Sequence, residues 1–369
     1  MRRPRCAAVV LCLCALLSSC AGPAPNAPAA NVYIPRGASL AAVTDSLVQH
    51  RVVTSRSWFR LYARLVGLAR RVRPGLYEFP EGERFGVIVG ALKTGRTHDF
   101  SFTAPEGLTV AEIADLAAAK LRLARDSVQT AVRDSFLAAA RDPALARAFG
   151  IAVPAGVRET LEGYLLPETY RVAYDETPRQ LVEHMLRQFT VFWDTGFDRR
   201  AAALGLSRHQ VLTLASVVEA EARSPGQRRR VAGVYMNRLR RGMPMQADPT
   251  VMYAVGQRLT RVLFRHLETR SPYNTYLHAG LPPGPICNPS RSSIEASLDP
   301  EEHAYLFFVA TPDGQVMYSN TASQHADSAN VARGLWAHWA AEKAHLEQQA
   351  RDSASAARRA ASRLPSRPR

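Results

Sequence analysis

A repeated pattern of apolar and polar positions divides the first part of the chain into short units. Each unit has an apolar stretch, a Pro-x-Gly turn and a new apolar series at helical spacing, and the copies are Ile34–Leu47, Ala104–Leu116 and, in part, Phe79–Leu92. A strand that ends at the turn and a helix that starts after it fit this pattern, with Ser39 or Thr109 as the helix cap. The repeat predicts small α+β modules.

Longer apolar series predict helices in the rest of the chain. The stretches at about 117–149 and at 179–192 carry apolar residues at helical spacing. Residues 211–218 are apolar on nearly every side, which predicts a buried helix. From about Ala340 the chain is rich in Ala, Arg and Ser, so we expect the last helix to fray into a disordered tail.

Glu219 directly follows the predicted buried helix and extends one of its faces. A carboxylic acid that loses water there is held protonated near neutral pH, as the general acid of glycosidic bond cleavage must be. Glu221 competes for this role and points about 200° away. The polar residues that follow Glu221 place it nearer water, which favours Glu219. An arginine-paired glutamate at a helix end, with no catalytic role, is the alternative for Glu219.

The N-terminus has the features of a secretory leader. Arg2, Arg3 and Arg5 precede the apolar run Ala7–Leu17. A helix needs roughly 20 residues to span a bilayer, so this run is too short. The next residues, up to Cys20, resemble a bacterial lipobox, so we predict that Cys20 is lipidated and that the body is exported and membrane-anchored. An ordinary signal peptide or an uncleaved anchor is the alternative.

Charge and cysteine content narrow the class of protein only in part. The formal net charge of +15 is carried almost entirely by arginine, which suits an anionic partner or reflects an Arg-rich proteome. An exported chain is not expected to bind nucleic acid. Cys287 is the one cysteine outside the leader, so the body has no internal disulfide. The sequence contains no zinc, P-loop, dinucleotide or serine-nucleophile motif, and we expect neither a metal nor a cofactor.

Polar and aromatic residues of the kind that bind sugars are dense between Leu161 and Asp327. Tyrosine rings stack on pyranose faces, and amide groups bind hydroxyl and acetamido groups. Packing under loops and satisfying turns is the alternative for each of them. The candidates for glycan binding are Glu162, Tyr164, Gln246, Asp248, Tyr273, Asn274, Tyr276 and Asn288.

Several motifs in one order resemble the YceG-like family of endolytic murein transglycosylases. They comprise Leu161–Tyr170, Ala215–Glu219, Asn237-Arg238-Leu239, Gln246–Thr250 and Tyr273–Pro289. The chain departs from the family pattern at Ala220 and Ala222, where a lysine and a hydroxyl residue are common. Its lipobox-like leader also departs from the transmembrane helix that the family usually carries, which leaves the anchor type and the target membrane open.

The resemblance implies a fold, a reaction and partners. It implies Glu219 as the single catalytic residue, which cleaves the bond between N-acetylmuramic acid and N-acetylglucosamine and leaves a 1,6-anhydro end. It also implies an N-terminal module similar to LysM modules, which bind N-acetylglucosamine polymers, and peptidoglycan glycan strands and synthases as partners. The other hypothesis is a non-catalytic peptidoglycan-binding lipoprotein.

The predicted fold class is α+β, with the LysM-like module before a mixed α+β catalytic domain. The predicted parts are a leader at 1–20, a tether at 21–31, the LysM-like module at 32–103, the catalytic domain at 104–335 and a helical, Arg/Ala-rich tail at 336–369.

Overall fold

The computed structural model describes residues 22–35, 37–95, 100–125, 129–173, 176–222 and 224–361. Cys20 and the rest of the predicted leader lie outside the described residues. The chain forms two compact units. The first holds the chain up to Ala104 with Ala111–Ala139 and Glu168–Met185, and the second holds Pro105–Val110, Ala140–Pro167 and the chain from Leu186. Both contain helices and small antiparallel sheets, which confirms the mixed α+β class.

A small N-terminal module in the first unit has its own core. Its two strands pair antiparallel, with Val32 opposite Tyr77, and both of these side chains are buried with Phe59 and Ile88. The first strand begins at Ala29, so it includes the last residues of the predicted tether. The elements are β1 (Ala29–Ile34), α2 (Leu40–Gln49), α3 (Arg56–Leu65), η1 (Leu68–Arg70), β2 (Gly75–Pro80) and α4 (Phe85–Thr94).

The predicted strand–turn–helix units are confirmed at all three places. Each Pro-x-Gly turn places its glycine at positive φ, +77° at Gly37, +73° at Gly82 and +73° at Gly107, where a residue with a Cβ would be strained. Ser39 caps α2 by accepting a hydrogen bond from the Ala42 amide at 3.2 Å. The third turn follows β3 (Phe100–Thr103) and leads directly into α5 (Val110–Arg125).

The helical stretch predicted at about 117–149 is divided into several helices. A new helix starts after Asp142, whose side chain accepts the Ala144 amide, and Pro143 stands in its first turn. The strand β4 (Thr169–Val172) pairs antiparallel with β3, and the helix predicted at 179–192 is confirmed. The helices are α6 (Gln129–Ala140), α7 (Pro143–Ala148) and α8 (Pro178–Phe192).

The second unit is built around α10 (Arg208–Glu221), the helix predicted from its all-apolar stretch. Ser207 and Gln210 form a capping box at its start, and every residue from Val211 to Val218 is buried. Helices α11 and α14 pack against it and against each other. The remaining elements are α9 (Thr195–Ala203), η2 (Pro225–Gln227), α11 (Arg228–Arg240), α12 (Asp248–Val255), α13 (Phe264–Leu267), α14 (Arg291–Leu298), β5 (Phe307–Ala310) and β6 (Val316–Ser319).

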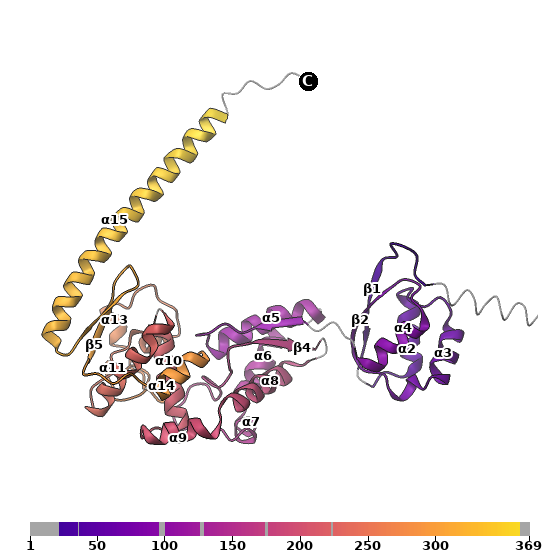
Figure 1. Ribbon diagram of the computed structural model, residues 1–369, viewed down its shortest axis with the longest axis horizontal. Coiled ribbons are helices and arrows are strands. Elements are labelled where there is room, and N and C mark those ends of the chain that lie inside the picture. The colour runs from indigo at the N-terminus through magenta and orange to yellow at the C-terminus, as the bar shows by residue number, and fades with distance from the viewer. Residues whose placement is uncertain are drawn as a thin grey trace, which may run out of the picture. The chain divides into compact units, whose positions relative to one another are not determined.

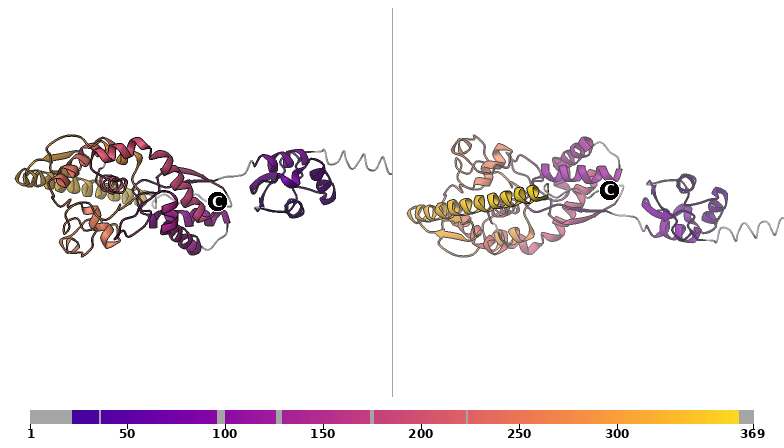
Figure 2. Two further views of the ribbon diagram at one scale, coloured as in Figure 1. Left: turned by 90° about the horizontal axis from the view of Figure 1, so that it is seen from below. Right: turned by 90° about the horizontal axis from the view of Figure 1, so that it is seen from above.

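The C-terminal helix α15 (Ala322–Ala361) includes the predicted helical extension. It contacts β5 and β6 and continues as one straight helix (Figures 1 and 2). Alanine, glutamate, glutamine and arginine, all good helix formers, continue through this stretch. The residues after Ala361, where the predicted frayed tail would fall, lie outside the described residues. Among the described residues, no helix has the length and apolar content needed to cross a membrane.

Candidate active site

The last turn of α10 carries two carboxylates with different surroundings. Glu219 and Glu221 are two positions apart, so they leave the helix about 200° apart and face different neighbours. Ala222 ends the helix with its amide still bonded to the Val218 carbonyl. The sequence did not separate these two acids by periodicity, because α10 is buried on all sides.

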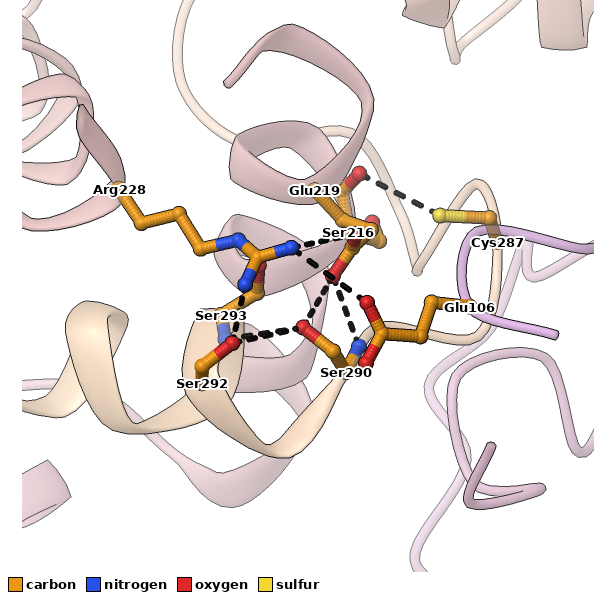
Figure 3. A network of polar contacts seen from close by, with 8 residues as sticks. All are labelled: Glu106, Ser216, Glu219, Arg228, Cys287, Ser290, Ser292 and Ser293. Carbon is orange, nitrogen blue, oxygen red and sulfur yellow. Dashed lines mark hydrogen bonds and ion pairs between the residues drawn. The ribbon is translucent and has the colours of Figure 1, made fainter. Parts of the chain in front are cut away.

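Glu219 lies in a dense polar network (Figure 3). Its Oε1 accepts a hydrogen bond from Arg228 at 3.1 Å, and its Oε2 accepts both the amide and the hydroxyl of Ser290 at 2.8 and 2.5 Å. The side chains of Glu219 and Arg228 are 8% and 9% exposed. Arg228 also reaches Glu106 at 3.5 Å and the hydroxyl of Ser292.

The sequence predicted that Glu219 loses water, and its side chain is indeed only 8% exposed, but its neighbours are polar and charged. The arginine pairing that the sequence left open as an alternative is present, and it involves a cation from the start of α11. With both oxygens engaged, the Glu219 carboxylate joins α10 to α11 and to the N-terminus of α14. Such a buried ion pair is destabilising to break.

Glu221 faces a different environment: it is partly exposed and lines a pocket. Burial, reinforced by the negative charge of Asp248, raises the pKa of Glu221 from its ordinary value to about 7. The hydroxyl of Tyr235 donates a hydrogen bond to Oε1 at 3.3 Å and opposes this rise in part. At neutral pH a large share of Glu221 therefore carries a proton.

Glu221 opens onto a pocket of about 330 Å³. The lining of the pocket combines polar and apolar side chains, as the lining of small-molecule sites commonly does. Its lining comes from the end of α10, from η2, α11 and α12, and from the hairpin of β5 and β6. The polar lining residues are Glu221, Gln227 and Asp248, and the apolar ones include Val231, Met252, Phe308 and Val316.

Three of the predicted glycan-binding residues are at least partly exposed, and one of them lines this pocket. Asp248 lines it and accepts a hydrogen bond from the Tyr276 hydroxyl at 2.7 Å. Burial and this bond to Asp248 raise the pKa of Tyr276, which keeps the hydroxyl protonated. Gln246 is exposed, with φ at +51°, and accepts a hydrogen bond from Arg238 at 3.2 Å. These residues retain the solvent contact that a ligand requires.

The other predicted glycan-binding residues are buried and form hydrogen bonds within the protein. The Tyr164 ring is 1% exposed, and its hydroxyl bonds to His209 at 3.0 Å. The Tyr273 hydroxyl accepts the Arg158 amide, and the Asn274 amide group donates to the Leu267 and Thr269 carbonyls.

Glu162 and Asn288 bond to each other inside the second unit. Their side chains meet at 3.0 Å, and both are almost fully buried. Asn288 also accepts the Gly163 and Leu165 amides, and Glu162 accepts the hydroxyl of Tyr253. The two residues therefore fasten the segment around Leu161 to the segment around Pro289.

Sequence reasoning missed Arg228, Ser290 and Gln227. Arg228 begins a run of three arginines, of which only this one is buried. The sequence alone therefore does not distinguish it from the two exposed arginines that follow. Ser290 follows a predicted motif and caps α14, a pattern that could have marked it. Within the part of the chain that the structure describes, no group of three His, Cys, Asp or Glu residues could hold a metal ion.

Comparisons with known proteins agree with the motif resemblance. A family model described as "YceG-like family" matches residues 32–331. A Bacillus subtilis protein named "Endolytic murein transglycosylase" is 33% identical over 80% of this chain and 82% of its own length. A Streptococcus pneumoniae protein of the same name is 29% identical over 80% of this chain and 56% of its own length. The crystal structure of a yceG-like protein from Listeria monocytogenes is 31% identical, with a TM-score of 0.57 over 81% of this chain and 98% of that one.

Proposed function

Because this chain belongs to the YceG-like family, we propose that it is an endolytic lytic transglycosylase of peptidoglycan in which Glu221 is the acid and base. Relatives of that name support the reaction. The observation that carries the choice of residue is the partly buried Glu221 carboxyl, whose pKa is raised to about 7 and which opens onto a pocket. Protonated acids of this kind are what glycosidic bond cleavage uses.

The reaction needs one group that gives a proton and then takes one. Glu221 donates its proton to the oxygen between N-acetylmuramic acid and N-acetylglucosamine, and the bond from that oxygen to C1 breaks. The Glu221 carboxylate then accepts the proton of the C6 hydroxyl of the muramic residue, and O6 closes on C1. A 1,6-anhydro end forms, Glu221 regains its proton, and no water is consumed. A second catalytic carboxylate, as hydrolases use, is not required.

Glu219 remains the residue that the sequence predicts, and its contacts favour a structural role instead. Its two oxygens already accept one hydrogen bond from Arg228 and two from Ser290. A glycosidic oxygen would have to displace these donors before it could approach the carboxyl group. Glu219 is therefore assigned to holding α10, α11 and α14 together, while Glu221 carries the chemistry.

The N-terminal parts fit the same function. The strand–turn–helix repeat supports a LysM-like module that binds N-acetylglucosamine polymers. The leader supports membrane attachment, with lipidated Cys20 as the proposed anchor and the body on the extracytoplasmic side. Peptidoglycan synthases are the proposed partners at that location, where cleavage would end nascent glycan strands.

Digestion of purified peptidoglycan, with products read by mass spectrometry, tests the reaction. We expect 1,6-anhydro ends and no incorporation of ¹⁸O from labelled water. Reducing ends that carry ¹⁸O would identify a hydrolase and would require a second carboxylate. Binding to peptidoglycan without cleavage, unchanged in Glu219→Gln and Glu221→Gln, would instead identify a non-catalytic scaffold.

A further inference from the structure

The helix α3 exposes an apolar surface on the side away from the module's core. Successive helical residues are about 100° apart, so Phe59 and Ala63, both fully buried, define the inner side. Trp58, Leu61 and Leu65 lie on the opposite side, together with Tyr62. Leu65 is 78% exposed, Leu61 48% and Tyr62 36%.

The neighbouring helix α4 contacts this surface. The Tyr62 ring lies 5.9 Å from the Phe85 ring, between centroids, at the start of α4. We call the surface formed by Trp58, Leu61, Tyr62 and Leu65 the α3 face.

Arginines without partners border the α3 face. Arg60 and Arg64 lie on α3 itself, and Arg70 and Arg71 follow it, three of the four being exposed and Arg60 partly so. None of them has an ion-pair partner among the residues that the structure describes. Arg56, by contrast, pairs with Asp45 at 3.2 Å. The α3 face therefore combines apolar side chains with uncompensated positive charge.

We propose that the α3 face binds a membrane surface that carries anionic lipids. Tryptophan and tyrosine sit at the boundary between acyl chains and headgroups, leucines insert below it, and arginines pair with lipid phosphates above it. An anionic but hydrated wall polymer would satisfy the arginines and leave the leucines in water. The combination of both kinds of side chain favours lipid.

The position of the module in the chain agrees with this partner. Eight residues, 21–28, separate the predicted leader from β1, and they span at most about 29 Å. A leader held in the membrane would keep the module within that distance of the lipid surface. The tether then supplies one attachment and the α3 face a second, so each needs only modest strength.

Vesicle binding by a chain that starts at Gly22 separates the α3 face from the leader. This chain keeps every described element, and the core of the module lies wholly between Ala30 and Leu92. We expect co-sedimentation with vesicles rich in phosphatidylglycerol and little with pure phosphatidylcholine. Brominated lipid quenches tryptophan that lies close to it. The emission of Trp58, obtained as the difference between the wild-type chain and Trp58→Phe, should therefore fall in vesicles that contain this lipid.

Two pairs of substitutions test which side chains act. Arg60→Glu with Arg64→Glu should weaken binding at least about 30-fold, because each lost arginine contributes about 1 kcal/mol near an anionic surface. Leu61→Ser with Leu65→Ser should weaken it without changing the salt dependence. The matched control carries the same charge change at two exposed arginines of the second unit, Arg240→Glu with Arg241→Glu.

The proposal is overturned if the wild-type chain does not bind anionic vesicles or binds neutral ones equally. It is also overturned if the control pair loses as much binding as the Arg60 and Arg64 pair. Loss of binding to isolated peptidoglycan, with vesicle binding unchanged, would reassign the α3 face to the wall polymer. Thermal unfolding of each variant by circular dichroism excludes misfolding as the cause of a loss.

Discussion

The raised pKa of Glu221 should make the stability of the folded protein depend on pH, and this can be tested without any substrate. The folded state raises this pKa from 4.5 to about 7, so it binds the proton more tightly than the unfolded chain does. Ionisation of Glu221 therefore costs the folded state stability as pH rises from about 4.5 to about 7, and the cost is constant above that. Glu221→Gln cannot ionise and avoids this cost.

The size of the effect follows from the shift. A rise of the pKa from 4.5 to about 7 corresponds to a loss of at most about 3.5 kcal/mol in the free energy of unfolding. Glu221 keeps some contact with solvent, which reduces the expected value to about 2 kcal/mol. Relative to the wild type, Glu221→Gln should thus gain about 2 kcal/mol of stability between pH 4.5 and pH 8.

Urea unfolding at a series of pH values measures this gain. Tryptophan fluorescence in a Trp58→Phe background reports on the second unit, which contains the other three tryptophans. The free energy of unfolding of Glu221→Gln minus that of the wild type should rise through pH 6 and level off above pH 7. A difference that stays constant with pH, or that grows as the pH falls, would refute the burial of an ionisable Glu221.

Two further substitutions follow from the same contacts. Glu219→Gln should destabilise the second unit by about 3 kcal/mol in the same urea assay at neutral pH, because the buried Arg228 loses its shorter ion pair and keeps only the 3.5 Å contact with Glu106; equal stability of variant and wild type would contradict the network. Asp248→Asn removes a charge that raises the pKa of Glu221, so the fall of kcat/KM above neutral pH should begin at lower pH; an unchanged profile would show that Asp248 does not act on the acid.

Local patterns predicted the elements well. The three Pro-x-Gly turns and the buried helix α10 follow from spacing, capping and glycine conformation within about ten residues, and all are confirmed. The helical extension predicted from 336 onward is present as the later part of α15, which reaches Ala361. Alanine-rich sequence is sufficient for a helix once its start is packed.

The details of the site depend on contacts distant in sequence, which local patterns do not contain. A helix buried on all sides has no apolar stripe, so nothing in α10 itself indicates which of its acids meets the pocket. That choice depends on Arg228 and Ser290, which engage Glu219, and on Asp248 and the β5–β6 hairpin, which enclose Glu221. The burial of Tyr164 is likewise set by distant neighbours.

The central claim is that Glu221, and not Glu219, transfers the proton. Release of 1,6-anhydro muropeptides from peptidoglycan by Glu221→Gln and by Glu219→Gln, at equal concentrations of folded protein, tests it most directly. We predict loss of at least about a hundredfold for Glu221→Gln, since general acid catalysis contributes about 10²–10⁴, and a partly active Glu219→Gln. An inactive but folded Glu219→Gln beside an active Glu221→Gln would contradict the account and return the catalytic role to Glu219.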